Sequence, residues 1–148
     1  MDHLTLAARD YRDLVVVEWH EAGHGTVAVA LGLPLARVEV GRVRDHGFTD
    51  LGRPVYDPYL RLLVLVAGRI GERLAPAWDE RFTALSASDD QRAIDSALGE
   101  LGWASAAPAE HEADLLLLDH RRGFRRLARA LAERRALDGA EVAAIVGR

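Results

Sequence analysis

The segment WHEAGHGTVAVAL (residues 19–31) places two histidines, His20 and His24, in an otherwise apolar stretch. Residues four positions apart lie on one face of an α-helix, one turn above the other. The two imidazoles can therefore hold one metal ion between them, with Glu21 beside that ion. Burying these three polar side chains among alanine, valine and leucine is costly unless they have a partner. The segment thus predicts a helix that carries a metal site, in preference to a core helix that merely contains three polar residues.

The H-E-x-x-H spacing gives each of its residues a chemical role. The chain contains no cysteine, so histidine, aspartate or glutamate must hold the metal. Zinc lowers the pKa of its bound water to about 7, which makes hydroxide available at neutral pH. Glu21 is expected to accept that proton and to pass it to the leaving amine. Gly23 and Gly25 each cost about 1 kcal/mol relative to alanine within a helix, which indicates that another element approaches the backbone closely.

A catalytic zinc needs a third protein ligand and one open coordination position. One known extension of the motif has glycine three residues and histidine six residues after the second histidine. Val27 and Ala30 stand at those positions, so this extension is excluded. A distant carboxylate or histidine must therefore complete the site.

Asp90 is the first candidate for the third ligand. In a helix predicted over 86–101 it shares one face with apolar residues, whereas Asp89 lies on a polar face. The apolar residues of that face are Ile94, Ala97, Leu98 and Leu101. An aspartate that faces the core at the start of a helix needs a cation or several hydrogen bonds, and a buried capping aspartate is the alternative. Glu110, four residues before Asp114, is the second candidate.

The apolar periodicity predicts a mainly α-helical, compact domain with one short β element after the helix that carries the histidines. The predicted helices cover residues 5–31, 57–75, 86–101, 109–133 (with a break near Gly123) and 140–146, and the strand covers 35–40. The expected boundary residues are Gly32 with Pro34, Pro58, Ser86 or Ser88, and the capping-box pair Asp138 and Glu141. Residues 41–54 are rich in glycine and charge and are expected to form a turn or loop.

Composition limits the classes of function. With 148 residues, of which 49% are hydrophobic and 28% charged, the chain fits one soluble domain over residues 1–148. A net charge of −4 disfavours nucleic acid and anionic membranes as partners, and the arginines within 121–135 are expected to form a solvated helix face. The charged N-terminus lacks the apolar core of a signal peptide, and no apolar run is long enough to cross a bilayer. We therefore expect a cytoplasmic protein.

Five segments occur in an order that is typical of one protein family. They are HEAGH (20–24), GFT (47–49), AGR (67–69) followed by Glu72, SDD (88–90) and the ending LARALAERRALDGAEVAAIV (127–146). These segments resemble the HEAGH, GYT, GGRAAEE, S-N-D and terminal segments of the peptidase domain of the FtsH-type AAA+ zinc metalloproteases, over roughly residues 12–146. The resemblance implies a zincin-like fold with Zn2+ as cofactor. It also implies that His20, His24 and Asp90 are the zinc ligands and that Glu21 is the catalytic base.

Two departures from the family pattern bear on function. Leu85 and Ser86 stand where the family has a threonine–glycine pair, and this chain has no nucleotide-binding P-loop and no membrane helices. In the family, the AAA+ ring unfolds the substrate and feeds it to the peptidase. We therefore expect this chain to cleave only loose or small polypeptides, unless a separate AAA+ motor serves it. A homo-oligomer is the other assembly expected.

Together these observations predict a zinc-dependent metalloendopeptidase that acts on polypeptides. The alternative is a non-catalytic, zinc-stabilised interaction module, but a purely structural site has no need of a base such as Glu21. A nucleic-acid-binding role for the basic helix is disfavoured by the net charge. The strand at 35–40 is further expected to offer its edge to an extended substrate.

Overall fold

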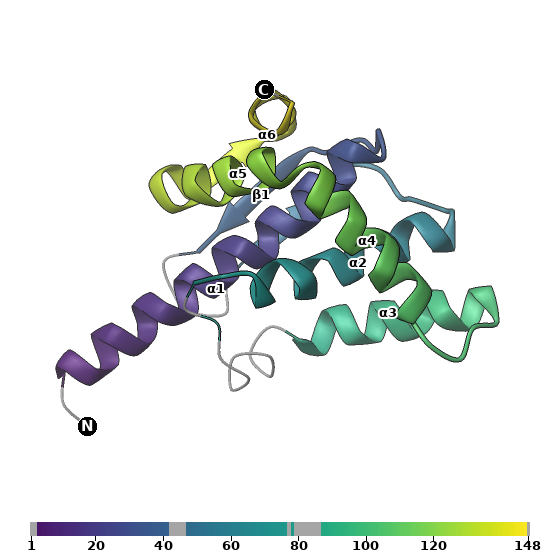
Figure 1. Ribbon diagram of the computed structural model, residues 1–148, viewed down its shortest axis with the longest axis horizontal. Helices are drawn as coiled ribbons and strands as arrows, with labels where there is room; N and C mark the ends of the chain where they lie inside the picture. Colours follow the sequence, from purple (N-terminus) through teal and green to yellow (C-terminus); the bar gives the residue numbers. More distant parts are fainter. Residues whose placement is uncertain (1–2, 42–46, 77, 79–86, 148) are drawn as a thin grey trace.

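The computed structural model describes residues 3–41, 47–76, 78 and 87–147, which form six helices and a small sheet (Figure 1). The elements, in chain order, are α1 (His3–Ala30), β1 (Arg37–Val40), β2 (Gly47–Asp50), α2 (Pro58–Arg73), α3 (Ala87–Leu101), α4 (Ala107–Asp119), α5 (Arg121–Arg134), β3 (Ala136–Asp138) and α6 (Gly139–Val146). The predicted mainly α-helical fold is therefore confirmed.

Helix α1 lies in the middle of the fold. It packs along α2 and α5, while α2 also packs against α3 and α4 (Figure 1). Residues 20–28 of α1 are all buried, so the polar side chains of this segment face other elements of the protein instead of water. Within the described part of the chain, no helix combines the length and the hydropathy that a bilayer span requires.

The C-terminus of α1 follows the prediction. Gly32 has a left-handed φ of 70°, and its N–H donates to the carbonyl of Val29. The N–H of Leu33 donates to the carbonyl of Ala28, which completes a Schellman motif. Glycine adopts this backbone conformation without the steric cost of a Cβ, so the helix ends here and the chain turns toward β1.

The close backbone approaches predicted at Gly23 and Gly25 are confirmed. A Cβ at Gly23 would collide with the carbonyl of Ala67, so α1 and α2 touch through their backbones. A Cβ at Gly25 would lie 3.1 Å from the Leu127 side chain of α5 and 3.4 Å from that of Val38 in β1. The two glycines therefore let α1 lie close to α2 on one side and to the sheet and α5 on another.

The sheet is larger than the single strand predicted. Strand β1 pairs antiparallel with both β2 and β3, in the order β2-β1-β3. The prediction that 41–54 is a loop is wrong for β2, while residues 42–46 lie outside the described residues. Both added strands are too short for an apolar alternation to indicate them, and pairing with β1 is what stabilises them.

The central position of β1 also overturns the expected substrate edge. Both sides of β1 are hydrogen-bonded, with Val38 opposite Thr49 on one side and opposite Leu137 on the other. The strand predicted at 35–40 therefore has no free edge to offer to a substrate. In the described sheet, the edge strands are β2 and β3.

The predicted helix ends are partly right. Asp57 caps α2 by accepting from the N–H groups of the next two non-proline residues, and Asp138 with Glu141 forms the predicted capping box of α6. The break predicted in 109–133 is observed, but it falls at His120, three residues before Gly123. Gly123 lies inside α5, where a Cβ would collide with the carbonyl of Val146, so this glycine serves helix packing.

The sequence predicts Ser86 or Ser88 as the N-cap residue of the third helix. Ser88 lies within α3, which begins at Ala87, so it is not the residue that precedes the helix. Ser86 lies outside the described residues.

The arginine-rich helix α5 has the predicted amphipathic form, because Leu127 and Leu131 are buried while Arg122, Arg125 and Arg129 are exposed.

Candidate metal centre

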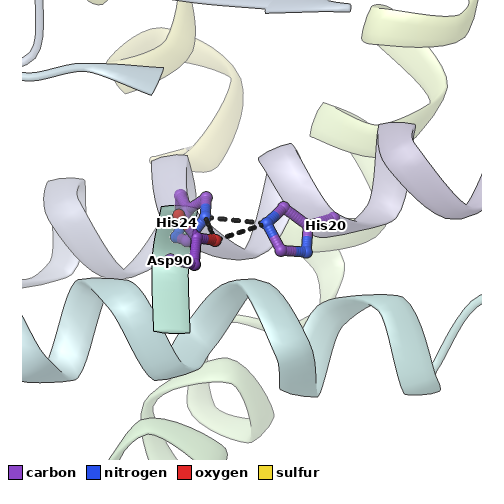
Figure 2. Close-up of side chains that lie close together, drawn as sticks. All are labelled: His20, His24 and Asp90. Atoms are coloured by element: carbon purple, nitrogen blue, oxygen red, sulfur yellow. Dashed lines mark hydrogen bonds and ion pairs between the residues drawn. The ribbon is translucent and has the colours of Figure 1, made fainter. Parts of the chain in front are cut away.

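Three side chains from α1 and α3 converge on one point (Figure 2). The Nε2 atoms of His20 and His24 lie 3.0 Å apart, and Oδ2 of Asp90 lies 2.9 Å from the first and 3.2 Å from the second. Among the described residues, this is the one group of three or more histidine, aspartate or glutamate side chains that could hold a metal ion. The predicted inward orientation of Asp90 is thus observed.

The spacing of these three atoms fits a small divalent cation. Ligand atoms at about 2.0–2.2 Å from a tetrahedral zinc lie about 3.3–3.6 Å from one another. The observed separations of 2.9–3.2 Å approach those values, so a small outward shift of each side chain would accommodate an ion. Two imidazoles and one carboxylate are also the donor types found in catalytic zinc sites.

Each imidazole is oriented by a second hydrogen bond behind it. Nδ1 of His20 lies 2.8 Å from Oε2 of Glu72, and Nδ1 of His24 lies 2.6 Å from the carbonyl oxygen of Val64. Because the Val64 carbonyl can only accept, Nδ1 of His24 donates to it, and this bond turns Nε2 toward His20 and Asp90. A carboxylate behind His20 has the same effect, and such partners raise the basicity of a metal-binding imidazole.

Glu72 is the site residue that the reasoning from side-chain spacing missed. It is 1% exposed and lies on the buried face of α2. A sequence signal was present, since Glu72 follows Gly68 by four residues and Leu65 by seven and so shares their helix face, and a buried carboxylate on such a face needs a partner. What the sequence could not supply was the identity of that partner.

The electrostatics of the site favour a positive charge between the carboxylates. Burial lowers the pKa of His20, but hydrogen bonds to Asp90 and Glu72 outweigh burial and raise it to about 10. Burial raises the pKa of Asp90, but hydrogen bonds from His20 and His24 hold it well below its usual range. The two shifts share the contact between His20 and Asp90, to which Glu72 adds a second carboxylate beside His20 and His24 adds a second imidazole beside Asp90. A bound cation would satisfy the same carboxylate field.

Gly68 allows α2 to lie directly against the two imidazoles. A Cβ at this position would be 2.5 Å from Nε2 of His24 and 2.8 Å from Cε1 of His20, distances that real Cβ atoms essentially never show. Any larger side chain must therefore displace the rings on which the metal site depends.

Gly68→Ala should weaken zinc binding by about tenfold or more, since the displaced rings lose their alignment. It should also lower the free energy of unfolding by about 1–3 kcal/mol through overpacking. Zinc titration against a competing chelator and denaturant unfolding measure the two effects. Gly99→Ala in α3 is the matched control, because its Cβ meets nothing within 4 Å and zinc affinity should not change. Equal zinc affinity in both variants would contradict this geometry.

Glu21 lies beside the three converging side chains. Its carboxylate is buried, and Oε2 accepts a hydrogen bond of 2.6 Å from Oγ1 of Thr49 in β2. This contact fixes one carboxylate oxygen. Thr49 belongs to the GFT segment, so β2, which was not predicted, connects that segment to the histidine helix.

A cleft of about 440 Å³ opens onto the site. Glu21, His24 and Asp90 all line it. Strand β2 forms one wall with Phe48 and Thr49, while α2 contributes Val64 and Leu65 and α3 contributes Ala93 and Ser96. His24 and Asp90 are therefore reachable from the cleft, whose walls are both polar and apolar.

The second candidate ligand, Glu110, is not part of this group. It lies on α4 and lines a separate surface pocket together with Ile70 and Arg73 of α2. The side chain of Asp89 lies outside the described part of the structure. Of the carboxylates considered from the sequence whose side chains the structure describes, Asp90 is the one found against both histidines.

Comparison of the sequence with models of known protein families gives no match, and comparison with curated proteins gives none either. The resemblance to the FtsH-type peptidase domain therefore remains a prediction from the quoted motifs.

Removal of a bound metal should destabilise the fold. Among the described elements α3 packs mainly on α2, and Asp90 is its connection to the histidines of α1. At free zinc about 1,000-fold above its dissociation constant, mass action adds about 4 kcal/mol, or a rise of about 10 °C in Tm. Thermal melts with added zinc and with a chelator measure the difference. Identical melting curves would contradict a metal site in the folded protein.

Proposed function

We propose that this protein is a zinc-dependent metalloendopeptidase. The observation that carries the proposal is the convergence of His20, His24 and Asp90, two of which, His24 and Asp90, line a cleft together with Glu21. Two nitrogen donors and one oxygen donor leave one position open in a tetrahedral site, which is the arrangement of catalytic zinc. When bound there, zinc would supply Lewis acidity to a water molecule and to the carbonyl of the scissile bond.

Glu21 is proposed as the general base. Its carboxylate lies in the cleft next to the metal ligands without belonging to their group, so it can face a water molecule there. Thr49 occupies Oε2, which leaves Oε1 to take a proton from that water and to deliver it to the leaving amine. Glu72 and the Val64 carbonyl keep the two imidazoles oriented during these steps.

An extended peptide fits the arrangement of the cleft. Strand β2 is an edge strand of the described sheet, and its residues Phe48 and Thr49 line the cleft. The backbone of an edge strand can pair with an extended segment, while side chains of that segment enter adjacent pockets. The strand that receives the substrate would therefore be β2, in place of β1.

One observation favours a second candidate, the non-catalytic interaction module. A metal held by Asp90 and the two histidines would tie α3 to α1, and this tie has structural value whether or not peptides are cleaved. The placement of Glu21 in an open cleft favours the catalytic alternative, because a purely structural metal needs neither the cleft nor the base.

The two candidates differ in a direct assay. Zinc-loaded protein should hydrolyse unfolded casein, a chelator should stop the reaction, and added zinc should restore it. Zinc-loaded protein that is folded but cleaves neither casein nor short peptides would exclude the peptidase and favour the interaction module. Cleavage of folded proteins would require a further assembly, for which we propose a separate AAA+ motor or a homo-oligomer.

A further inference from the structure

Arg61 lies in the same cleft as the metal site. It stands on α2, one turn before Val64, whose carbonyl orients His24. Its side chain is 28% exposed and lines the cleft. Among the described residues of the lining, Arg61 alone carries a permanent positive charge, since the others are neutral, acidic or histidine.

The guanidinium of Arg61 is held in place by the backbone. Nη1 donates to the carbonyl oxygens of Val55 at 2.9 Å and Tyr56 at 3.0 Å. These two bonds use the donors of one nitrogen and leave the edge formed by Nε and Nη2. That edge is one of the two that bind a carboxylate through parallel hydrogen bonds. The two backbone carbonyls therefore hold the guanidinium of Arg61 so that its carboxylate-binding edge, Nε and Nη2, is directed away from them.

Glu100 is the residue that now pairs with this edge. It forms an ion pair with Nη2 of Arg61, and among the described residues Nε of Arg61 has no hydrogen-bond partner. The side chain of Glu100 is 52% exposed, in the last turn of α3. A half-exposed ion pair of this kind contributes little to stability, so another carboxylate can replace Glu100 at small cost.

We propose that Arg61 binds a carboxylate of the peptide substrate and that the site thereby selects acidic peptides. This inference rests on the proposed peptidase function. Glu100 follows Asp90 by ten residues, or about 15 Å along a helix at about 1.5 Å per residue. Because long side chains reach toward one another, the distance between their functional groups is shorter than this span along the helix. An extended peptide covers about 3.3 Å per residue. The carboxylate bound by Arg61 therefore belongs two to four residues from the scissile bond.

The test compares peptides that differ only in charge. A neutral parent peptide is varied to aspartate or to asparagine at the second, third and fourth positions on each side of the scissile bond. A second pair ends in a free carboxylate or an amide, which separates an acidic side chain from a chain terminus. At one of these positions, the zinc-loaded full chain should cleave the peptide that carries the carboxylate with a kcat/KM about tenfold or more above that of the matching amide peptide.

Substitutions then assign the preference to Arg61. Arg61→Met should reduce the ratio of acid to amide kcat/KM to near one, and Glu100→Gln should raise it because the competing carboxylate is gone. Arg73→Met is the matched control, since Arg73 lies at the other end of α2 and outside the cleft lining. It should leave the ratio unchanged.

The possible outcomes separate this inference from the function on which it rests. If the wild-type protein cleaves peptides without any acidic preference, or if Arg61→Met keeps the preference, the role of Arg61 is wrong and the peptidase stands. If the wild-type protein cleaves no peptide, both proposals fall. Should Arg61→Met not fold, Glu100→Gln decides, because a ratio that does not rise overturns the inference.

Discussion

Glu21→Gln should reduce peptide hydrolysis by the zinc-loaded protein about 10²- to 10⁴-fold while leaving zinc bound. The amide has the shape of the carboxylate, and its oxygen can still accept the hydrogen bond that Thr49 donates at 2.6 Å in the wild-type protein. It cannot accept a proton from water, so the loss falls on the chemical step. The measurements are kcat/KM on a fluorogenic peptide and the zinc content of the same sample.

Glu112→Gln provides the control for this experiment, because Glu112 is an exposed glutamate on α4 and should keep full activity. Hydrolysis by Glu21→Gln at near the wild-type rate would show that Glu21 is not the base. If zinc is lost together with activity, Glu21 supports the metal itself and its assigned role is wrong.

Asp90→Asn should weaken zinc binding by more than about 100-fold, beyond the loss typical of residues that only support a ligand, and should abolish hydrolysis. A neutral amide is a much poorer ligand than a carboxylate. The substitution also removes the charge that lies 2.9 Å from Nε2 of His20 and 3.2 Å from that of His24. Zinc affinity, measured by competition with a chromogenic chelator, tests this directly.

One aspartate variant and one glutamate variant distinguish this loss of zinc affinity from a general effect of removing a negative charge. Asp95→Asn removes an exposed aspartate of the same helix, and Glu110→Gln removes the rival carboxylate on α4. Both variants should bind zinc as the wild type does. If Asp90→Asn keeps wild-type affinity while Glu110→Gln loses it, the third ligand has been assigned to the wrong helix.

Much of the site follows from local periodicity. The spacing of His20 and His24 required only that their segment be helical, and the apolar face of 86–101 was enough to turn Asp90 inward. Helix ends at Gly32, Asp57 and Asp138 follow from capping chemistry within a few residues. All of these inferences depend on interactions between residues close together in the chain.

The remaining parts of the site depend on contacts between distant segments. Strand β2 exists because it pairs with β1, and nothing in its own four residues has a strand period. Glu72 acquires a role only through His20, which is 52 residues away in the chain. Arg61 faces the cleft only because α2 packs between α1 and α3. Such partners can be identified only after the helices are placed.

The break between α4 and α5 illustrates the same limit in another way. Glycine inside a helical pattern indicated a break near Gly123, but the packing of α6 requires a small residue there. The helix instead ends at His120, whose own N–H and whose ring Nδ1 both lie at hydrogen-bond distance from the carbonyl of Leu116. Local propensity was outweighed by a tertiary contact at this position.

The metal content of the protein, purified without added metal and measured by elemental analysis, tests the central claim most directly. We predict about one zinc per chain, because three ligands and their supporting hydrogen bonds favour retention of the ion during purification. Protein that is folded but free of metal, and that takes up no zinc when it is supplied, would contradict the account.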